Sequence, residues 1–351
     1  MSTSPEKQSK MDPFSRPDGG QGKKGMPEQS TSKSGAFQRV TSSFRDRVTA
    51  DKSGAYPAEA GRYHLYVSLA CPWAHRTLIM RKLKGLERAI DVTVVHYMLD
   101  GDGWRFASKD EDPQCDLDPL HKDFKLLRDV YRLSQADYSG RVTVPVLFDK
   151  TKQKIVNNES SEIIRMLNSE FNALCATKEQ RALDFYPDGH GSAQADSELI
   201  ARIDAINDKV YHNVNNGVYK CGFAGSQEAY EEAYDALFAM LDELESTLAK
   251  QRYLADARRI TEADVRLITT LLRFDAVYVV HFKCNKRRLC DYPNLWAYAR
   301  ELYALPAVKE TTNFRHIKKH YFMSHLAINP TQFVAKGFDV DWDAPHNRAA
   351  L

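Results

Sequence analysis

Hydrophobic and polar positions recur with two different periods along the first half of this 351-residue chain. Short runs in which Val, Leu, Ile and Tyr alternate with polar residues predict strands. Longer stretches with apolar residues three or four positions apart predict helices. The predicted strands are residues 62–69, 91–98, 142–149 and 154–158, and the predicted helices are residues 74–85, 121–135 and 159–171. This order of elements, with a long loop over 100–119, favours a mixed sheet that carries helices on its faces.

The second half of the chain has a different pattern, because the alternating runs disappear after a polar stretch at 172–196. Apolar residues then recur at helical spacing, and the predicted helices are residues 197–216, 228–250, 261–280 and 292–306. Thr261 and Asp264 form a candidate capping box at the start of the third of these helices. The C-terminal half is therefore predicted to be all-helical.

These patterns divide the chain into five predicted segments. We expect a disordered tail over 1–35, an α/β domain over 36–171, a linker over 172–196, a helical domain over 197–327 and an irregular tail over 328–351. The first 35 residues are rich in Ser, Lys, Gly, Gln and Pro and nearly free of large aliphatic residues. Such a composition cannot bury enough apolar surface to fold, which predicts disorder there.

Composition and charge narrow the classes of function. Apolar residues make up 43% and charged residues 27%, as in soluble globular proteins. Lys and Arg number 49 against 47 Asp and Glu, and this small excess predicts neither a nucleic-acid nor a membrane-surface partner. We find no apolar run of the roughly 18 residues that a membrane span needs. The N-terminal tail has no signal-peptide core and contains acidic residues, so a cytoplasmic location is expected.

The six cysteines are scattered too sparsely for a disulfide framework, and a reducing compartment would keep them as thiols. The nearest approach to a metal site is the stretch that contains His281, Cys284 and Cys290. It has no second ligand pair at zinc-finger spacing, and three Lys or Arg residues separate its cysteines. We therefore expect no metal, and we interpret these cysteines as buried or incidental thiols.

Cys71 differs from the other cysteines because it lies between a predicted strand and a predicted helix. Pro72 suits the first position of a helix, where a missing N–H is no loss. Cys71 would then be the N-cap, with unpaired N–H groups and the positive end of the helix dipole directed at its sulfur. Both favour the thiolate and predict a pKa lowered from about 8.5 into the range of roughly 3.5–7.5. The alternative is a small buried residue that closes the strand.

A second cysteine is absent three residues later, where Ala74 stands. A dithiol would resolve its own mixed disulfide, whereas a single thiol needs a second thiol from outside. An intracellular thiol such as glutathione is the natural partner.

A glutathione site needs a backbone edge for the cysteinyl part and a group that binds the γ-glutamyl end. Val144, which precedes Pro145, is placed to offer its N–H and C=O to a peptide. Glu159 and Ser160 begin a predicted helix, whose N-terminus receives a carboxylate while the Glu159 side chain neutralises an ammonium. Plain helix capping by Glu159 and Ser160, and an edge-strand proline at Pro145, are the alternatives.

Several long stretches of the chain carry information that these local patterns do not use. They are GRYHLYVSLACPWAHRTLIMRKLKGLE, DGWRF, RVTVPVLFD, VNNESSEIIRM, NNGVYKCGFA, RYLADARRITEADVRLITTLLRFDAVYVVHFKCN and NFRHIKKHYFMSHLAINPT. In them the chain resembles the glutathionyl-hydroquinone reductases, the Xi class of glutathione transferases, which are related to the omega class. The resemblance extends from about residue 55 to residue 331. It implies a thioredoxin-like N-terminal domain that binds glutathione, an all-α glutathione-transferase C-terminal domain and a homodimer.

The resemblance also implies a reaction, in which a glutathionyl-hydroquinone and glutathione give free hydroquinone and glutathione disulfide. It assigns the nucleophile to Cys71 and the proton donor to Tyr219, and it implies that the hydroxyls of Tyr278 and Tyr321 approach the cysteine sulfur, lower its pKa and line the aromatic site. The residues that the resemblance implies for glutathione binding are Trp104, Arg141, Val142, Thr143, Val144, Glu159 and Ser160.

Local sequence alone gives these aromatic residues ordinary roles. By this interpretation Tyr219 is an exposed residue of a polar loop, Tyr278 is helix core, Tyr321 lies on the surface and Trp104 anchors a loop. Two rival functions also stay open. One is an omega-like glutathione-dependent thiol transferase or dehydroascorbate reductase, which shares the cysteine chemistry. The other is a non-catalytic transferase module used for protein docking, against which a retained Cys71 and a complete glutathione site argue.

Overall fold

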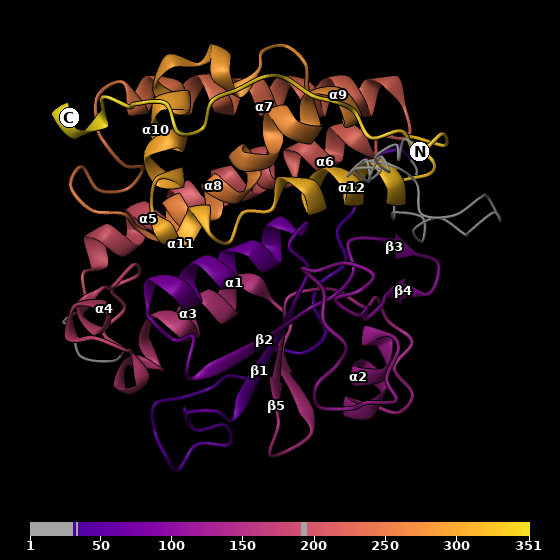
Figure 1. Cartoon of the computed structure of the whole chain (residues 1–351). Coiled ribbons are helices and arrows are strands. Elements are labelled where there is room, and N and C mark those ends of the chain that lie inside the picture. The colour runs from indigo at the N-terminus through magenta and orange to yellow at the C-terminus, as the bar shows by residue number, and fades with distance from the viewer. Residues whose placement is uncertain (1–30, 33, 191–194) are drawn as a thin grey trace, which may run out of the picture.

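The computed structural model describes residues 31–32, 34–190 and 195–351. Most of the predicted disordered tail lies outside the described residues, so that expectation stays a prediction. Figure 1 shows an α/β half packed against a layer of helices from the second half of the chain. Among the described residues, no helix combines the length and the apolar character that crossing a membrane requires.

A four-stranded mixed sheet forms the centre of the first half. Its strands are β1 (Tyr63–Val67), β2 (Ile90–Val94), β5 (Val146–Asp149) and β6 (Lys154–Asn157). The order across the sheet is β2-β1-β5-β6, in which β1 runs parallel to β2 and antiparallel to β5, and β5 and β6 form an antiparallel hairpin. Every residue of the central strand β1 is buried. The four predicted strands are confirmed, each one to four residues shorter than its pattern, and β2 begins one residue earlier than predicted.

Three helices complete the α/β half: α1 (Pro72–Leu83), α2 (Leu127–Ser134) and α3 (Ser160–Ser169). Helices α1 and α3 contact each other, and Figure 1 shows them between the sheet and the helical half. Helix α2 contacts β6 and lies farther from the helical half. This arrangement confirms the thioredoxin-like unit.

The start and the end of α1 follow from its sequence. Cys71 is the N-cap in extended geometry, its C=O accepts the first helical hydrogen bond from the N–H of His75 at 3.0 Å, and Pro72 occupies the first helical position. The helix stops before Gly85, whose φ of +61° lies in the left-handed region that favours glycine. The predicted strand–cysteine–proline–helix junction is therefore present.

The segment between β2 and α2 departs from the prediction. The loop predicted over 100–119 contains a short hairpin, β3 (Leu99–Asp100) and β4 (Gly103–Trp104), so Trp104 lies on a strand. The helix predicted from residue 121 begins only at Leu127, because the Asp129 carboxylate accepts hydrogen bonds from the N–H groups of Lys125 and Leu126 and caps it there.

The second half of the described chain is helical, as predicted. Its helices are α4 (Lys178–Ala182), α5 (Ser197–Val210), α6 (Gly217–Gly222), α7 (Gln227–Leu248), α8 (Glu262–Arg273), α9 (Val279–His281), α10 (Pro293–Tyr303), α11 (Pro306–Lys309) and α12 (Phe314–Ser324). The capping box is confirmed, since the Asp264 carboxylate accepts from the Thr261 N–H at 2.8 Å. The predicted helices 197–216 and 261–280 are interrupted by π-helical turns at Tyr211–Asn215 and Phe274–Tyr278.

Two of the local interpretations of tyrosines are wrong. Tyr219 lies in α6 rather than in a polar loop, because the π-helical turn carries the helix past the Asn-Asn-Gly sequence. Tyr321 lies in α12, which the pattern did not predict, and it is only 1% exposed. Tyr278 is fully buried in the core, as its apolar neighbours predicted.

The predicted irregular segments are more ordered than their composition suggested. Residues 172–196 include α4 and a short 3-10 turn, Asn172–Leu174. In the C-terminal tail, Trp342 packs against the ring of Trp296 at 4.7 Å, and buried Arg348 donates to the carbonyl oxygen of Leu248 at 2.5 Å. The tail is irregular in secondary structure but is fixed to the helical half.

Candidate active site

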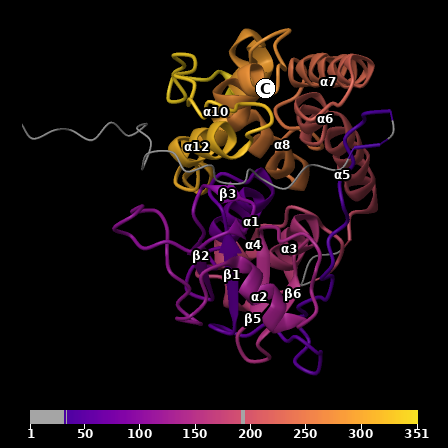
Figure 2. The ribbon, with the colours of Figure 1, turned by 90° about the vertical axis from the view of Figure 1, so that its right-hand side faces the viewer.

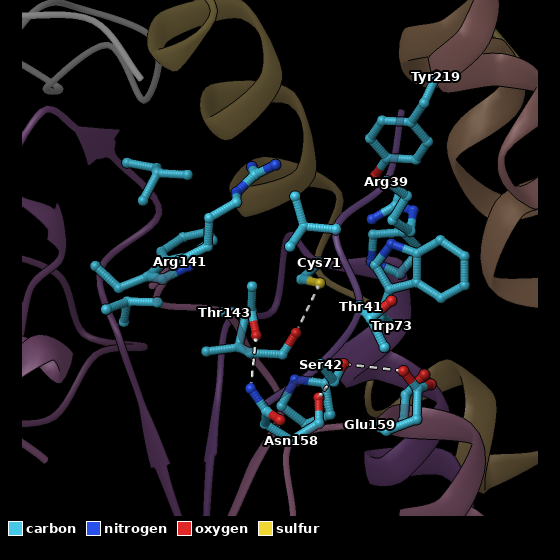
Figure 3. Close-up of a pocket in the computed structure, with 18 of the residues that line it drawn as sticks. Arg39, Thr41, Ser42, Cys71, Trp73, Arg141, Thr143, Asn158, Glu159 and Tyr219 are labelled. Atoms are coloured by element: carbon cyan, nitrogen blue, oxygen red, sulfur yellow. Dashed lines mark hydrogen bonds between the residues drawn. The ribbon is translucent and has the colours of Figure 1, made fainter. Parts of the chain in front are cut away.

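A cavity of about 330 Å³ opens where the two halves of the molecule meet (Figure 3). The α/β half contributes the Cys71 junction, the segment before β5 and the start of α3, and the helical half contributes α6 and α12. The site residues expected from the sequence that line it are Cys71, Trp104, Arg141, Val142, Thr143, Val144, Glu159, Ser160, Tyr219 and Tyr321. Residues from parts of both halves that are far apart in the chain are thus brought together around one thiol.

Cys71 is half-buried and directs its sulfur into this cavity (Figure 3). The thiol donates a long hydrogen bond, 3.6 Å from sulfur to oxygen, to the carbonyl of Val144. The backbone N–H groups of Ala74 and Trp73 lie near enough to favour a thiolate, although the thiol makes no capping hydrogen bond to them.

The pKa of Cys71 is raised rather than lowered. Burial is the largest influence and disfavours the thiolate, while the N–H groups of Ala74 and Trp73 and the guanidinium groups of Arg273 and Arg39 oppose it. The prediction of a net depression is therefore wrong, because it left out the desolvation of the sulfur. The N–H groups at the start of α1, on which the prediction was based, do lie near the sulfur and favour the thiolate.

Arg273 from α8 fixes the loop that carries the cysteine. Its Nε donates to the carbonyl oxygen of Ala70 at 2.8 Å and its Nη2 to that of Leu69 at 3.2 Å. Its Nη1 bonds the Nδ1 of His75 at 3.2 Å. Burial and the nearby cation Arg273 hold the pKa of His75 well below its ordinary value, so the imidazole is neutral and accepts this hydrogen bond. A fully buried cation thereby connects the two halves directly behind Cys71.

The backbone beside the sulfur offers an edge of peptide groups. The Val144–Pro145 bond is cis, and within the described residues the Val144 N–H makes no hydrogen bond. The preceding residue is held in place, since Tyr131 Oη donates to the Thr143 carbonyl at 2.9 Å and Asn158 Nδ2 to its Oγ1 at 3.3 Å.

The start of α3 closes another side of the cavity. Glu159 is the N-cap of this helix, and its Oε1 accepts from the backbone N–H of Ser161 at 3.1 Å. Its Oε2 accepts from Ser42 Oγ at 3.0 Å (Figure 3). Ser160 is buried at the first turn. The sequence left open whether Glu159 caps the helix or belongs to a binding site. In the structure Glu159 caps α3 and also lines the cavity.

Three tyrosine hydroxyls form a chain on the helical side. Tyr219 Oη lies 2.6 Å from Tyr321 Oη, which lies 2.9 Å from Tyr278 Oη. Tyr219 and Tyr321 line the cavity, whereas Tyr278 lies behind them. Burial raises the pKa of all three, so they are neutral donors. Among the described residues no tyrosine hydroxyl is hydrogen-bonded to the Cys71 sulfur, and these hydroxyls bond one another. The effect of Tyr278 and Tyr321 on the pKa of Cys71, which the resemblance implies, stays a prediction.

Trp104 forms the wall next to α12. Its indole stacks on the imidazole of His320, with ring centroids 5.1 Å apart and planes inclined by 23°. His320 bonds the carbonyl oxygen of Tyr97 through Nδ1 at 2.8 Å, which fixes the ring. His325 also lines the cavity and is hydrogen-bonded to His281 at 3.1 Å.

Several lining residues were not among the site residues predicted from the sequence, although Pro72 and Pro145 entered that prediction through their effect on the backbone. They are Arg39, Val40, Thr41, Ser42, Arg45, Pro72, Trp73, Leu99, Pro145, Asn158, Tyr211, His320 and His325. The segment that contains Arg39 and Ser42 has no periodic pattern that would have marked it. Figure 2 shows this segment running from the helical half near α5 and α6 to the α/β half.

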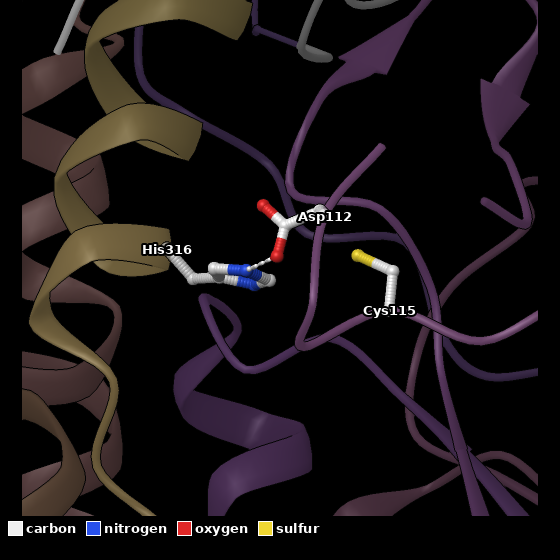
Figure 4. A group of neighbouring side chains, drawn as sticks. All are labelled: Asp112, Cys115 and His316. Carbon is white, nitrogen blue, oxygen red and sulfur yellow. Dashed lines mark hydrogen bonds and ion pairs between the residues drawn. The ribbon is translucent and has the colours of Figure 1, made fainter. Parts of the chain in front are cut away.

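Asp112, Cys115 and His316 form a second cluster, away from the cavity (Figure 4). Their carboxylate, thiol and imidazole atoms lie within 4.8 Å of one another, and such groups can bind a metal ion. The Asp112 carboxylate, however, already accepts two hydrogen bonds from Arg315, at 2.5 and 2.7 Å, and one contact with His316 at 3.1 Å. A cation would have to displace the guanidinium, so we interpret the cluster as an ion-pair network that joins the loop after β4 to α12.

Comparison with known proteins gives consistent matches. The glutathione S-transferase N-terminal domain model matches residues 70–170, and the C-terminal domain model matches residues 227–301. The chain is 51% identical over 320 residues to glutathionyl-hydroquinone reductase YqjG of Escherichia coli (strain K12), a match that covers 90% of this chain and 92% of the relative. It is 46% identical over 309 residues to glutathionyl-hydroquinone reductase PcpF of Sphingobium chlorophenolicum, covering 87% and 91%.

Solved structures agree with these relatives. The crystal structure of the glutathione-S-transferase Xi from Phanerochaete chrysosporium superposes with a TM-score of 0.83 at 50% identity, covering 91% of this chain and 97% of that one. The glutathione-bound structure of YqjG from Escherichia coli K-12 superposes with a TM-score of 0.81 at 50% identity, covering 88% and 96%. Relatives in two yeasts are named omega-like glutathione S-transferases. The chain therefore belongs to the Xi class of the glutathione S-transferase family, the class of the glutathionyl-hydroquinone reductases.

Proposed function

We propose that this protein reduces glutathionyl-hydroquinones with glutathione, through a mixed disulfide between Cys71 and glutathione. The observation that carries the proposal is the position of the Cys71 thiol and the hydroxyls of Tyr219 and Tyr321 around one cavity. A nucleophilic sulfur and neutral proton donors in one cavity are what the cleavage of a carbon–sulfur bond on a quinol ring requires.

Glutathione would bind along the α/β side of the cavity. The Val144 N–H is available to pair with the cysteinyl part of the tripeptide. The first turn of α3, at Ser160, would receive the γ-glutamyl carboxylate, and Glu159 would neutralise the ammonium. Arg141, Val142, Thr143 and Trp104 line the remaining contact surface.

In the first half of the cycle the Cys71 thiolate attacks the thioether sulfur of the conjugate. The sulfur–sulfur bond forms, the carbon–sulfur bond breaks and its electron pair passes to the ring. Tyr219 supplies the proton of the new carbon–hydrogen bond, and hydroquinone leaves. Burial keeps Tyr219 protonated, and its hydrogen bond to Tyr321 at 2.6 Å orients the hydroxyl.

In the second half a glutathione thiolate attacks the mixed disulfide, releases glutathione disulfide and regenerates the Cys71 thiolate. A single enzyme thiol is sufficient, because the second thiol comes from solution. No disulfide partner is needed within the chain, and Cys71 is unpaired. The two half-reactions predict ping-pong kinetics.

A glutathione-dependent thiol transferase or dehydroascorbate reductase would use the same Cys71 chemistry. The chain of tyrosine hydroxyls favours the reductase, because transfer between two disulfides needs no proton on carbon, whereas release of a hydroquinone does.

The proposal includes a cytoplasmic location and a homodimer. All six cysteines are free thiols, which fits a reducing compartment. The homodimer follows from the resemblance to the family, and light scattering of the purified protein tests it.

Steady-state turnover of two substrates tests the proposed function. One is a glutathionyl-hydroquinone, and the other is a small mixed disulfide of glutathione, each with free glutathione. We expect turnover of the conjugate with ping-pong kinetics. Turnover of the disulfide alone would replace the reductase by a thiol transferase, and no turnover of either would favour a docking module.

A further inference from the structure

Arg39 places a cation on the aromatic side of the cavity. Its guanidinium lies over the ring of Trp73 at 4.6 Å and over the ring of Tyr219 at 5.0 Å. Its Nε donates to Asn216 Oδ1 at 2.6 Å. Figure 3 shows it next to Tyr219 and Trp73, to one side of the Cys71 sulfur. These contacts fix the direction of the side chain without neutralising its charge.

The segment around Arg39 is held at both ends. Phe37 stacks on Tyr219, with ring centroids 6.3 Å apart, and the Gly225 N–H donates to the Gly35 carbonyl at 2.8 Å. At the other end, Ser42 donates to Glu159. The backbone of Arg39 is therefore anchored to both halves of the molecule across the cavity.

The other cations of the cavity have different surroundings. Arg45 is hydrogen-bonded to the Glu162 carboxylate at 2.8 and 2.5 Å. Arg141 lies on the far side of the sulfur from Arg39 in Figure 3, beside the segment proposed to bind glutathione. Within the described part of the chain no carboxylate forms an ion pair with Arg39. Arg39 is thus a cation that lies on the side of the cavity formed by Trp73 and Tyr219.

The proposed reaction creates negative charge there. In the ionised form of Cys71, which is the form that reacts, the charge is on the sulfur. Tyr219 first delivers a proton to the ring carbon that carries the sulfur while a ring hydroxyl gives up its proton, so that the ring takes its keto form. As the carbon–sulfur bond then breaks, its electron pair restores the aromatic ring and leaves the negative charge on that ring oxygen, which takes up one proton. The two sulfurs are oxidised to a disulfide and the ring carbon is reduced, so the step balances with one proton. A fixed cation near both Cys71 and Tyr219 stabilises the charge at each stage.

On the basis of the proposed function, we infer that Arg39 binds a ring oxygen of the hydroquinone as it becomes anionic, and thereby makes the enzyme specific for conjugates of phenols. A planar guanidinium offers two donors to one oxygen or to neighbouring oxygens, and Tyr219 and Trp73 hold it in place. Arg39 is then a specificity residue on the aromatic side, separate from the glutathione contacts.

The ratio of two activities tests this role. The quantities are kcat/KM for a glutathionyl-hydroquinone and kcat/KM for a small glutathione mixed disulfide, measured in the same Arg39→Met variant. Because both substrates use the same Cys71, any change in thiolate fraction cancels in the ratio. We expect the ratio to fall by about 10- to 100-fold, since an electrostatic donor to the developing oxyanion is lost. Arg39→Lys keeps the charge but not the planar donors, and we expect an intermediate ratio.

Arg47→Met is the matched control, because Arg47 is an exposed arginine of the same segment that does not line the cavity. We expect it to leave the ratio unchanged. An equal fall of both activities in Arg39→Met would overturn the role and leave Arg39 as a structural residue. A rise in the KM for glutathione with an unchanged ratio would place Arg39 on the tripeptide instead. A wild-type enzyme inactive on the conjugate would refute the proposed function itself, a separate outcome.

Discussion

The reactivity of Cys71 is set by opposing contributions that meet at one sulfur atom. Burial disfavours the thiolate, whereas the helix N–H groups and two guanidinium groups favour it. Arg273 is fully buried and also holds the backbone before the cysteine, so it combines charge stabilisation with positioning. The reactivity of Cys71 towards a partner sulfur in the cavity therefore depends on the balance between burial and these four groups.

The pH dependence of Cys71 alkylation tests this balance. Because the net direction of the pKa is upward, the thiol is mostly protonated at neutral pH. We expect the alkylation rate with iodoacetamide to rise with pH, with a midpoint above the value of about 8.5 for an unperturbed cysteine. Peptide mass spectrometry separates Cys71 from the other five cysteines. A rate that has already levelled off at pH 6 would contradict the account.

The tyrosine chain predicts unequal roles for its members. Tyr219→Phe removes the hydroxyl proposed to protonate the ring, so we expect kcat for the conjugate to fall by about 100-fold or more. Tyr278→Phe removes a hydroxyl that lies behind the cavity, and we expect a smaller loss. Stopped-flow release of hydroquinone measures both. Equal losses in the two variants would argue for a shared structural role.

Single site residues could be predicted from the sequence where the backbone of a predicted element determines which groups surround them. Cys71 and Glu159 were identified because a helix start exposes N–H groups at a predictable position. Arg39 and His320 were not, since their place in the cavity depends on contacts between segments far apart in the chain. The raised pKa of Cys71 also depends on burial, which no local pattern reports.

Because Cys71 is the N-cap of α1, the reactive residue also affects the stability of this helix. Cysteine is a weak N-cap, and the Cys71 thiol makes no capping hydrogen bond. In Cys71→Ser the hydroxyl oxygen can accept from the N–H groups of Trp73 or Ala74, which are at the second and third helical positions.

We therefore expect Cys71→Ser to abolish turnover while it raises the free energy of unfolding by about 0.5–1 kcal/mol. Urea unfolding followed by circular dichroism measures the stability, and the conjugate assay measures turnover. A loss of stability would show that the thiol contributes packing that a hydroxyl cannot replace.

The elements themselves were predictable where periodicity was long and uninterrupted. Helix α7 and the capping box at Thr261 agree with their patterns. Helix α12 was not predicted, because its buried face contains Lys and His residues and therefore shows no apolar periodicity. His316 and Tyr321 belong to this face. The π-helical turns were also missed, since one extra residue in a turn leaves the apolar pattern almost unchanged.

The two halves of the molecule are joined by buried charges as well as by apolar packing. Asp112 in the loop after β4 binds Arg315 at the start of α12, the helix that carries Tyr321. It also binds His316 of the same helix (Figure 4). Burial alone would raise the pKa of Asp112, but hydrogen bonds from Arg315 and a backbone N–H outweigh it and lower the pKa to about 2.

This lowered pKa predicts how stability depends on pH. The stabilisation is fully present above the unfolded-state pKa of about 4 and is lost as the pH falls from about 4 towards 2. At pH 7 we expect Asp112→Asn to lower the free energy of unfolding by about 1–2 kcal/mol, a reduced value because Arg315 is partly exposed and water screens its charge. Denaturant unfolding at several pH values measures this. The difference from wild type should shrink below pH 4, and a constant difference would contradict the ion-pair account.

The division into an α/β half and a helical half was predictable, because the change of period near residue 172 is a property of the sequence. The cavity between the halves was not predictable from periodicity, since its walls come from the N-terminal segment, the segment before β5 and α12. The resemblance to the family identified site residues that periodicity could not identify. Ten of the residues that it assigned line the cavity.

The most direct test of the whole account is the intact mass of the protein after it is mixed with a glutathionyl-hydroquinone in the absence of free glutathione. We predict the gain of one glutathionyl group on the wild type, release of one equivalent of hydroquinone and reversal of the adduct by added glutathione. The Cys71→Ser variant should gain nothing. An unmodified wild type that releases no hydroquinone, or an adduct that also forms on Cys71→Ser, would contradict the proposed mixed disulfide.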